Sequence, residues 1–119
     1  MTIKKTLDIP VYECKLHIFI APNIDRVIKS TMKKLGLPYE DGRPVFGFAL
    51  TRFTDYYLFL HSTNLTYNTV AHELRHIVDY ILEDREFEVY SEKEAAAYLS
   101  GYLFEEVMHL IIKKNIEIS

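Results

Sequence analysis

Apolar and polar residues follow strand-like patterns in three parts of the chain. Residues 11–21 (VYECKLHIFIA) are rich in strand-forming side chains and partly alternate between apolar and polar positions, which predicts a strand. Residues 46–53 (FGFALTRF) and 56–61 (YYLFLH) predict two more strands. Thr54 and Asp55 between them indicate a hairpin turn.

Helical periodicity dominates the segments between and after these strands. From Asn23 to Leu35, apolar residues recur three and four positions apart, and Gly36 is well placed to end the helix. Residues 36–44 contain two prolines and two glycines and predict a loop. The polar residues 62–68 lead into a second helix of about 18 residues.

The last part of the chain predicts one more helix. Residues 87–90 are expected to be extended, and the helix should run from about Ser91 to Lys114. The predicted order is therefore strand, helix, strand, strand, helix, helix, which is typical of the α+β class. With 119 residues and no internal repeat or linker, residues 1–119 are expected to form a single domain.

Composition narrows the class of protein. The formal net charge of -3, without a long basic run, argues against nucleic acid as a partner. Because Cys14 is the only cysteine, no intramolecular disulfide can form. Residues 1–10 lack the apolar stretch of a signal peptide, and no apolar run is long enough to span a membrane. The expectation is a soluble protein of the cytoplasm, without a membrane partner.

The second predicted helix contains the sequence His72-Glu73-Leu74-Arg75-His76, which is the H-E-x-x-H pattern of zinc peptidases. On a helix, His72 and His76 lie on one face, one turn apart, so both imidazoles can bind one cation. Glu73 is turned by about 100° from His72 and can reach a water molecule without binding the metal. The pattern predicts His72 and His76 as ligands of one Zn²⁺ ion and Glu73 as a general base.

An ordinary surface helix with two histidines is the alternative. The apolar stripe of the same helix, which should face a core, lies nearly opposite to the histidines. They are therefore not core histidines, although they could be plain solvent-facing residues. A metal site is favoured because chance would produce this pattern in such a chain only on the order of a few times per thousand. The apolar stripe consists of Val70, Leu74, Ile77, Val78 and Ile81.

A catalytic zinc site needs a third protein ligand. Glu94 is favoured, because the small residues Ala97 and Gly101 on its helical face would let another backbone approach closely. Ser91 and Glu94 also fit a capping box, in which the glutamate binds the start of its own helix. Both roles for Glu94 remain open at this point. The other candidates are His17, His61, Glu86, Glu88, Glu92, Glu105, Glu106 and His109.

The two histidines, together with Glu94-Ala-Ala-Ala-Tyr98-Leu-x-Gly101-Tyr102, resemble the small gluzincin-type metallopeptidases, or minigluzincins. The similarity is greatest to metallopeptidases encoded in phages and prophages, and it covers about residues 69 to 104. It implies zinc ligation by His72, His76 and Glu94, with Glu73 as the catalytic base. It also implies a cytoplasmic setting, in a bacterium or a phage-infected host cell.

The resemblance further implies a compact zincin-like fold, in which a small mixed or antiparallel sheet packs on the active-site helix and a C-terminal helix. The strand at residues 56–61 would be the sheet edge that binds an extended peptide by strand addition. Tyr98 would be a further catalytic residue that orients a ligand or stabilises an oxyanion, unless it serves in packing. By its position one turn beyond His76, Asp79 could support that ligand, but a solvated carboxylate is favoured.

The expected function is zinc-dependent hydrolysis of peptide bonds in an extended peptide or protein substrate. Two alternatives use the same fold. In the first, the chain is a non-catalytic binding or regulatory protein of phage or prophage origin. In the second, it is a latent peptidase whose segment Lys113 to Ser119 occupies the cleft.

Overall fold

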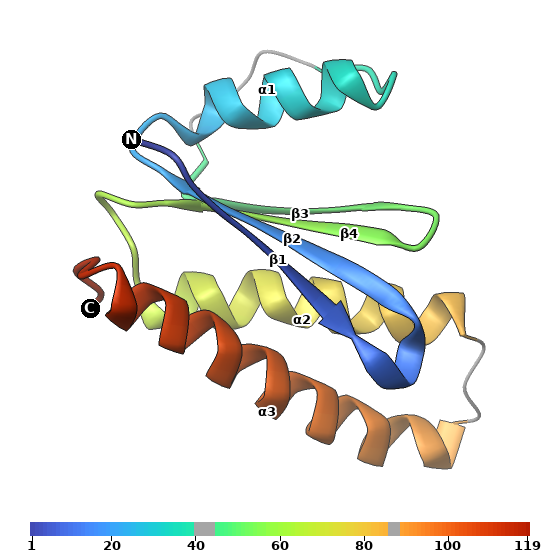
Figure 1. The fold of residues 1–119 in the computed structure, drawn as a ribbon. Coiled ribbons are helices and arrows are strands. Elements are labelled where there is room, and N and C mark those ends of the chain that lie inside the picture. The colour runs from blue at the N-terminus through green and yellow to red at the C-terminus, as the bar shows by residue number, and fades with distance from the viewer. Residues whose placement is uncertain (40–44, 86–88) are drawn as a thin grey trace.

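The computed structural model describes residues 1–39, 45–85 and 89–119, and these form three layers. A four-stranded sheet lies in the middle, with α1 on one face and α2 and α3 on the other (Figure 1). The α+β class and the mixed sheet packed on two helices are confirmed.

The sheet has the strand order β1-β2-β4-β3. The strands are β1 (Ile3–Ile9), β2 (Cys14–Ala21), β3 (Gly47–Arg52) and β4 (Asp55–His61). β2 and β4 are parallel, whereas β1 pairs with β2 and β3 pairs with β4 in antiparallel register. The chain crosses from β2 to β4 through α1 and β3, so the two central strands are not neighbours in sequence.

Alternation along the central strands divides the apolar residues between the two faces of the sheet. Leu16, Ile18 and Ile20 of β2 belong to the core that α2 and α3 cover. Phe19 of β2 and Phe59 of β4 belong to the smaller core under α1. Both faces of the sheet are therefore covered by helices, as the apolar composition of β2 and β4 requires.

Helix α1 (Ile24–Lys34) lies within one residue of its predicted limits at each end. Gly36, at φ +72°, ends it in the left-handed conformation that glycine adopts most easily. The amide of Gly36 donates to the carbonyl of Lys33, and the amide of Leu37 donates to that of Met32. This pair of hydrogen bonds is a Schellman motif, which satisfies carbonyls at the end of the helix.

Helix α2 (Tyr67–Asp84) has 18 residues, as predicted. The side chain of Thr66 caps it by accepting a hydrogen bond from the amide of Thr69 at 3.0 Å. The predicted apolar stripe is confirmed as the buried face of this helix. Its buried residues are Val70, Leu74, Ile77, Val78, Ile81 and Leu82.

Helix α3 (Val89–Lys113) begins two residues before the predicted start. Residues 87 and 88 lie outside the described residues, and the extended structure predicted for Val89 and Tyr90 is wrong because both are helical. Ser91 therefore lies inside the helix rather than at its N-cap, so the helix boundary does not match the capping box predicted for Glu94.

The strand predicted over residues 11–21 is shorter than expected, and a strand was missed before it. Residues Pro10–Tyr12 form a single 3-10 turn, and β2 begins at Cys14. The missed strand is β1. It has charged residues on its exposed side because it is a sheet edge, and such residues discourage pairing with other chains. The same residues obscure its apolar alternation.

The hairpin between β3 and β4 turns one residue earlier than predicted, at Phe53 and Thr54. Phe53 takes a positive φ of 58° at this turn. A larger correction concerns residues 56–61, which were expected to form the sheet edge. They lie in β4, which pairs on both sides, and β3 is the edge strand next to it.

Hydrogen bonds hold the C-terminal end of α2 to the rest of the chain. The hydroxyl of Tyr56, a fully buried residue of β4, donates to the carboxylate of Asp84 in the last turn of α2. Arg85 follows directly and donates from Nε to the carbonyl of Tyr12 at 3.0 Å. This end of the helix is therefore attached both to the central strand and to the connection between β1 and β2.

No helix in the described part of the chain is long and apolar enough to cross a membrane.

We predict that Tyr56→Phe lowers the free energy of unfolding at pH 7 by about 1.5–3 kcal/mol, because it removes a hydrogen bond to a charged acceptor. Burial, followed by the Asp84 contact, raises the pKa of Tyr56 above its ordinary value of 10.0. The folded state thus favours the protonated hydroxyl. This stabilisation is complete below pH 10 and is lost as the pH rises through the folded-state pKa.

Urea unfolding of wild type and variant at several pH values checks this prediction. The difference between the two proteins should be constant up to about pH 10 and should shrink above it. The matched control is Tyr102→Phe, which changes an exposed tyrosine of α3 and should leave stability unchanged. A difference that stays constant above pH 10 would show that the hydroxyl does not titrate as proposed.

Candidate metal centre

The candidate site lies on the face of α2 that points away from the core. His72 and His76 are exposed, whereas Leu74 and Ile77 on the opposite side are buried. Because the helix rotates about 100° per residue, packing of the apolar stripe fixes the outward direction of the histidines. The predicted separation of the two faces is confirmed.

The two imidazoles point their Nε2 atoms at each other. The distance between His72 Nε2 and His76 Nε2 is 3.3 Å, and the ring planes are 83° apart. In tetrahedral zinc sites, Zn–N bonds of about 2.0–2.1 Å place two ligand nitrogens about 3.3–3.4 Å apart. Without a metal, one Nε2–H can donate to the other nitrogen at the same distance. The spacing of the two nitrogens fits zinc.

Tyr80 lies against the second histidine. Its ring is stacked on that of His76, with 6.3 Å between centroids and 22° between planes. Tyr80 follows His76 by one helical turn, so the i to i+4 spacing could have predicted the contact. Stacking restricts the rotation of the imidazole and so helps to orient it.

Glu73 is a half-buried residue of α2, and its side chain lies next to Gly47 of the edge strand β3. A Cβ atom added to Gly47 of β3 would lie 2.8 Å from Glu73 Cγ and 2.8 Å from Thr69 Cγ2. Only glycine therefore fits at position 47 without displacing a side chain. Gly47 was not predicted from the sequence as a site residue, although glycine inside a strand is a known sign of close approach by another group.

The surroundings of Glu73 change its acidity. Burial raises the pKa of the Glu73 carboxyl, and the nearby His72 and His76 oppose this shift. A carboxyl with a raised pKa is a better proton acceptor than an ordinary surface glutamate. His72, Glu73 and His76 each offer a ligand atom, and these atoms lie within 4.8 Å of one another.

Glu94 does not belong to this group of potential metal ligands. Within residues 1–39, 45–85 and 89–119, the only group of three or more potential ligands is His72, Glu73 and His76. Glu94 is exposed on α3, on the side opposite to the buried Ala96 and Leu99. Its role as third ligand therefore stays a prediction.

The other candidate ligands are elsewhere or have other partners. His17 binds Thr6 and Asp55, and His61 binds Thr63. Glu86 and Glu88 lie outside the described residues, as does the side chain of Glu92. The group of potential metal ligands around the histidines also does not include the remaining candidates on α3, which are Glu105, Glu106 and His109.

Two further predicted site residues lie in different surroundings from the histidines. The side chain of Tyr98 is 76% exposed, so the alternative of core packing is not supported within this chain. Asp79 forms an ion pair with Arg75, with 3.1 Å between Oδ1 and Nε. This ion pair, rather than a bond to His76, is the contact that the structure gives Asp79.

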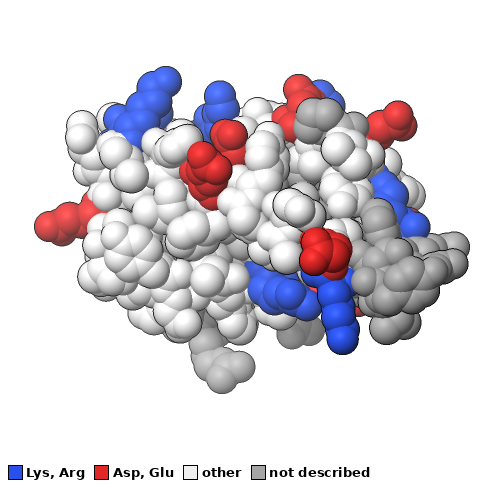
Figure 2. Space-filling model, turned by 90° about the horizontal axis from the view of Figure 1, so that it is seen from below, with Lys and Arg blue, Asp and Glu red and all other residues white. Residues whose placement is uncertain are grey.

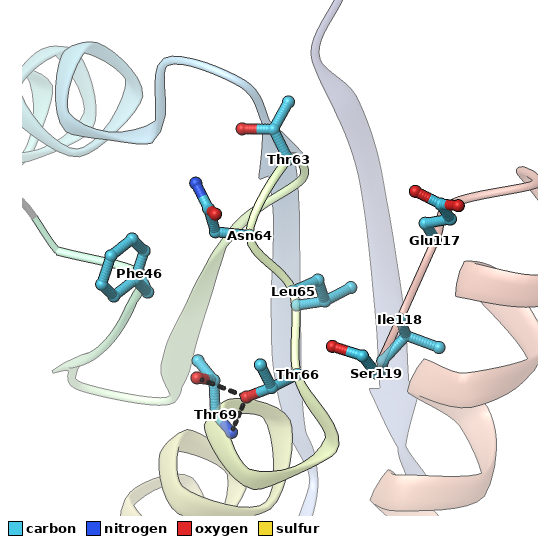
Figure 3. A pocket seen from close by; sticks show the side chains of 9 residues that line it. All are labelled: Phe46, Thr63, Asn64, Leu65, Thr66, Thr69, Glu117, Ile118 and Ser119. Carbon is cyan, nitrogen blue, oxygen red and sulfur yellow. Dashed lines mark hydrogen bonds between the residues drawn. The ribbon is translucent and has the colours of Figure 1, made fainter.

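A cavity of about 510 Å³ lies at the N-terminal end of α2 (Figure 3). Phe46, just before β3, and Thr69 of α2 contribute to its lining, as do residues 63–66 and 117–119. The backbone of Ser119 donates to the carbonyl of Leu65 and accepts from the amide of Tyr67. The C-terminal segment thus lies against the loop before α2, and none of its residues belongs to the group of potential metal ligands.

The face that carries α2 and α3 bears both kinds of charge. Figure 2 shows acidic and basic side chains interspersed among mostly uncharged residues, rather than gathered by sign.

No protein-family model matches the chain, and no curated protein or solved structure is significantly similar to it.

We predict that Gly47→Ala lowers the free energy of unfolding by about 1–3 kcal/mol, the usual cost of overpacking. The added methyl group would displace Glu73 or Thr69 from its present position. Urea unfolding measures the loss, and a crystal structure of the variant would show which side chain moves.

The matched control for this variant is Gly101→Ala in α3. Apart from the neighbouring backbone of the same helix, no atom of the described residues lies within 4 Å of a Cβ added there. It should raise stability by up to about 1 kcal/mol, because alanine favours a helix more than glycine does. Equal effects of the two substitutions would refute the close contact between β3 and α2.

Proposed function

We propose that this chain is a zinc-dependent peptidase that hydrolyses peptide bonds, with His72 and His76 as ligands of one zinc ion. The 3.3 Å spacing between their Nε2 atoms is the observation that carries the proposal. A half-buried carboxylate within 4.8 Å of both histidines supports a hydrolytic role rather than a purely structural one. The resemblance to gluzincin-type metallopeptidases points to the same activity.

Zinc, when bound, supplies Lewis acidity that makes water ionise near neutral pH and polarises a carbonyl group. The protein supplies the general base. Glu73 accepts a proton from the attacking water on its carboxylate and later donates it to the leaving amine. Its position between α2 and β3 restricts the carboxylate, and burial raises its pKa toward the range that proton transfer requires.

The edge strand β3 is the proposed binding surface for substrate. It pairs only with β4 among the described strands, so its outer backbone groups are free to bind an extended peptide. Gly47 brings this edge directly against Glu73. A peptide added to β3 would therefore run beside the catalytic base.

Glu94 is proposed as the third ligand. It lies on α3, which packs against α2, and a catalytic zinc site ordinarily has three protein ligands. Tyr98, one turn further along α3, is proposed to contact the substrate, since its exposed hydroxyl is available for hydrogen bonding.

We predict that the purified protein binds one zinc ion per chain and that His72→Ala reduces its zinc content to background. The matched control is His109→Ala, an exposed histidine of α3 outside the ligand group, which should keep full zinc content. Glu94→Ala should weaken binding at least about tenfold if its carboxylate is the third ligand. Elemental analysis and competition with a chelating dye measure content and affinity.

Two results would contradict this prediction in different ways. Full zinc content in His72→Ala would refute the histidine site. Unchanged affinity in Glu94→Ala would refute the third ligand alone and leave the histidine pair in place.

We predict that Glu73→Gln keeps zinc but lowers peptide cleavage by at least about a hundredfold, the usual range for loss of a general base. Cleavage of a mixed peptide library, with and without a chelator, measures activity. The matched control is Glu83→Gln, an exposed glutamate on the same helix, which should keep wild-type activity. Full activity in Glu73→Gln would refute the mechanism. Equimolar zinc without cleavage by the wild type would favour the non-catalytic alternative.

A further inference from the structure

A second cavity, of about 210 Å³, lies on the opposite face of the sheet from the metal centre. It is placed between the sheet and the C-terminal end of α1, which contacts β2 and β4. Lys4 of β1, Phe19 of β2 and Tyr57 of β4 line it from the sheet, and Lys34 lines it from α1. Its lining shares no residue with the metal centre.

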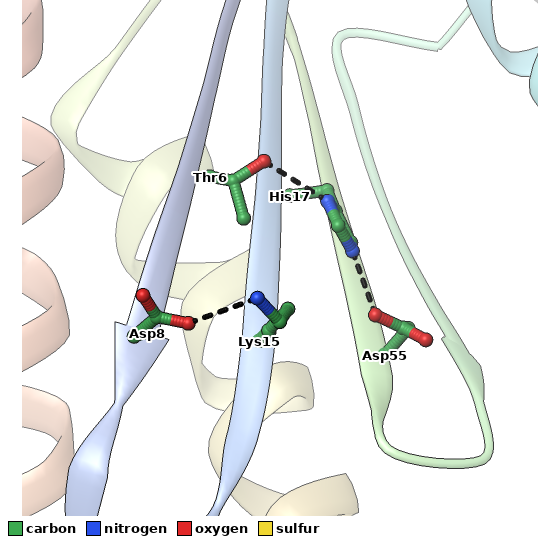
Figure 4. A network of polar contacts seen from close by, with 5 residues as sticks. All are labelled: Thr6, Asp8, Lys15, His17 and Asp55. Atoms are coloured by element: carbon green, nitrogen blue, oxygen red, sulfur yellow. Dashed lines mark hydrogen bonds and ion pairs between the residues drawn. The ribbon is translucent and has the colours of Figure 1, made fainter.

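Aromatic rings form one wall of this cavity. His17 and Tyr57 are stacked, with 4.8 Å between centroids and 23° between planes. The ring of His17 is held from both sides, because Nδ1 binds the hydroxyl of Thr6 and Nε2 binds Asp55 (Figure 4). Both nitrogens are occupied, so His17 offers a ligand only the face or edge of its ring. A fixed set of rings is suited to a flat apolar group.

Two lysines line the same cavity. Lys4 Nζ lies 5.4 Å from the centroid of the Phe19 ring, and Lys34 is in the last turn of α1. Neither lysine forms an ion pair with a residue that the structure describes, whereas the nearby Lys15 pairs with Asp8. Each lysine also has an ordinary role. Lys4 discourages pairing of other chains with a sheet edge, and Lys34 interacts favourably with the negative end of a helix dipole. Neither role explains why both lysines line the same cavity.

The hydroxyl of Tyr57 adds a third polar group. Most of this residue is buried, but no buried side-chain oxygen or nitrogen lacks a hydrogen bond in the described part of the chain, so the unbonded hydroxyl of Tyr57 is accessible to solvent and to a ligand. Burial and the nearby Asp55 raise the pKa of Tyr57, so the hydroxyl remains a donor at neutral pH. The nearby carboxylate of Asp55 could repel an anion. However, its Oδ1 already accepts the hydrogen bond from His17 Nε2 at 2.8 Å.

We propose that this cavity binds a small aromatic oxyanion, such as an aryl phosphate or an aryl carboxylate. The anionic group would contact the ammonium groups of Lys4 and Lys34, and the aromatic body would pack on the rings of the cavity wall. Charge-assisted hydrogen bonds supply affinity, while the small volume restricts the size of the ligand. The site is independent of zinc binding and of peptide hydrolysis.

Titration of the ¹⁵N-labelled protein with phenyl phosphate tests the proposal by NMR. Saturable shifts are expected at the amides of Phe19, Leu35 and Tyr57, which line the cavity. Inorganic phosphate and phenol, titrated separately, should each bind more weakly than phenyl phosphate. Shifts centred on His72 and His76 would place the anion at the metal centre and overturn the proposal, as would the absence of saturable shifts.

Two double variants with the same change of net charge distinguish specific binding in the cavity from general electrostatic attraction to lysines. Lys4→Ala with Lys34→Ala should weaken binding of phenyl phosphate at least about tenfold, as expected for the loss of two charged contacts. Lys5→Ala with Lys33→Ala removes exposed neighbours that do not line the cavity and should have little effect.

A third variant, Tyr57→Phe, keeps the ring and removes only the hydroxyl, so it should weaken binding even if a lysine variant does not fold. Equal weakening by the two lysine pairs would overturn the proposal. Binding of phenol or inorganic phosphate as tight as that of phenyl phosphate would also overturn it.

Discussion

The packing of α2 against the sheet is the interaction on which the rest of the structure depends. Six apolar side chains of this helix are buried, and each contributes about 1.5–3 kcal/mol when removed from water. Rotation of the helix about its axis would expose these side chains, so its orientation is strongly determined. That orientation turns His72 and His76 outward, and it places Glu73 beside β3. The positions of the site residues thus follow from a purely apolar contact on the other side of the helix.

Local sequence patterns predicted the elements that have strong periodicity or clear end signals. The limits of α1 followed from its apolar spacing and from Gly36, and α2 followed from its apolar stripe. β1 was missed because Lys4, Lys5 and Asp8 interrupt its alternation. The order of strands could not be predicted in the same way. β4 pairs with β2 across an intervening helix and strand, and this long-range pairing makes β3 the edge.

The candidate site shows the same division between local and long-range information. The i to i+4 spacing was enough to bring His72 and His76 together, because both lie on one helix. The contact of Gly47 with Glu73 joins a strand to a helix, so no pattern within either segment contains it. The direction of Glu94 depends on how α3 crosses α2, which residue spacing along α3 does not determine.

The hydrogen bonds of Ser119 have a consequence for the order of folding. They connect the loop before α2 to a segment about fifty residues further along the chain, so this contact closes a long loop. Contacts of such high sequence separation form slowly, and these cannot form on the ribosome until Ser119 has emerged. The helix that carries the histidines can therefore form early from local contacts, whereas the wall of the cavity at its N-terminal end is completed only when residues 117–119 reach it.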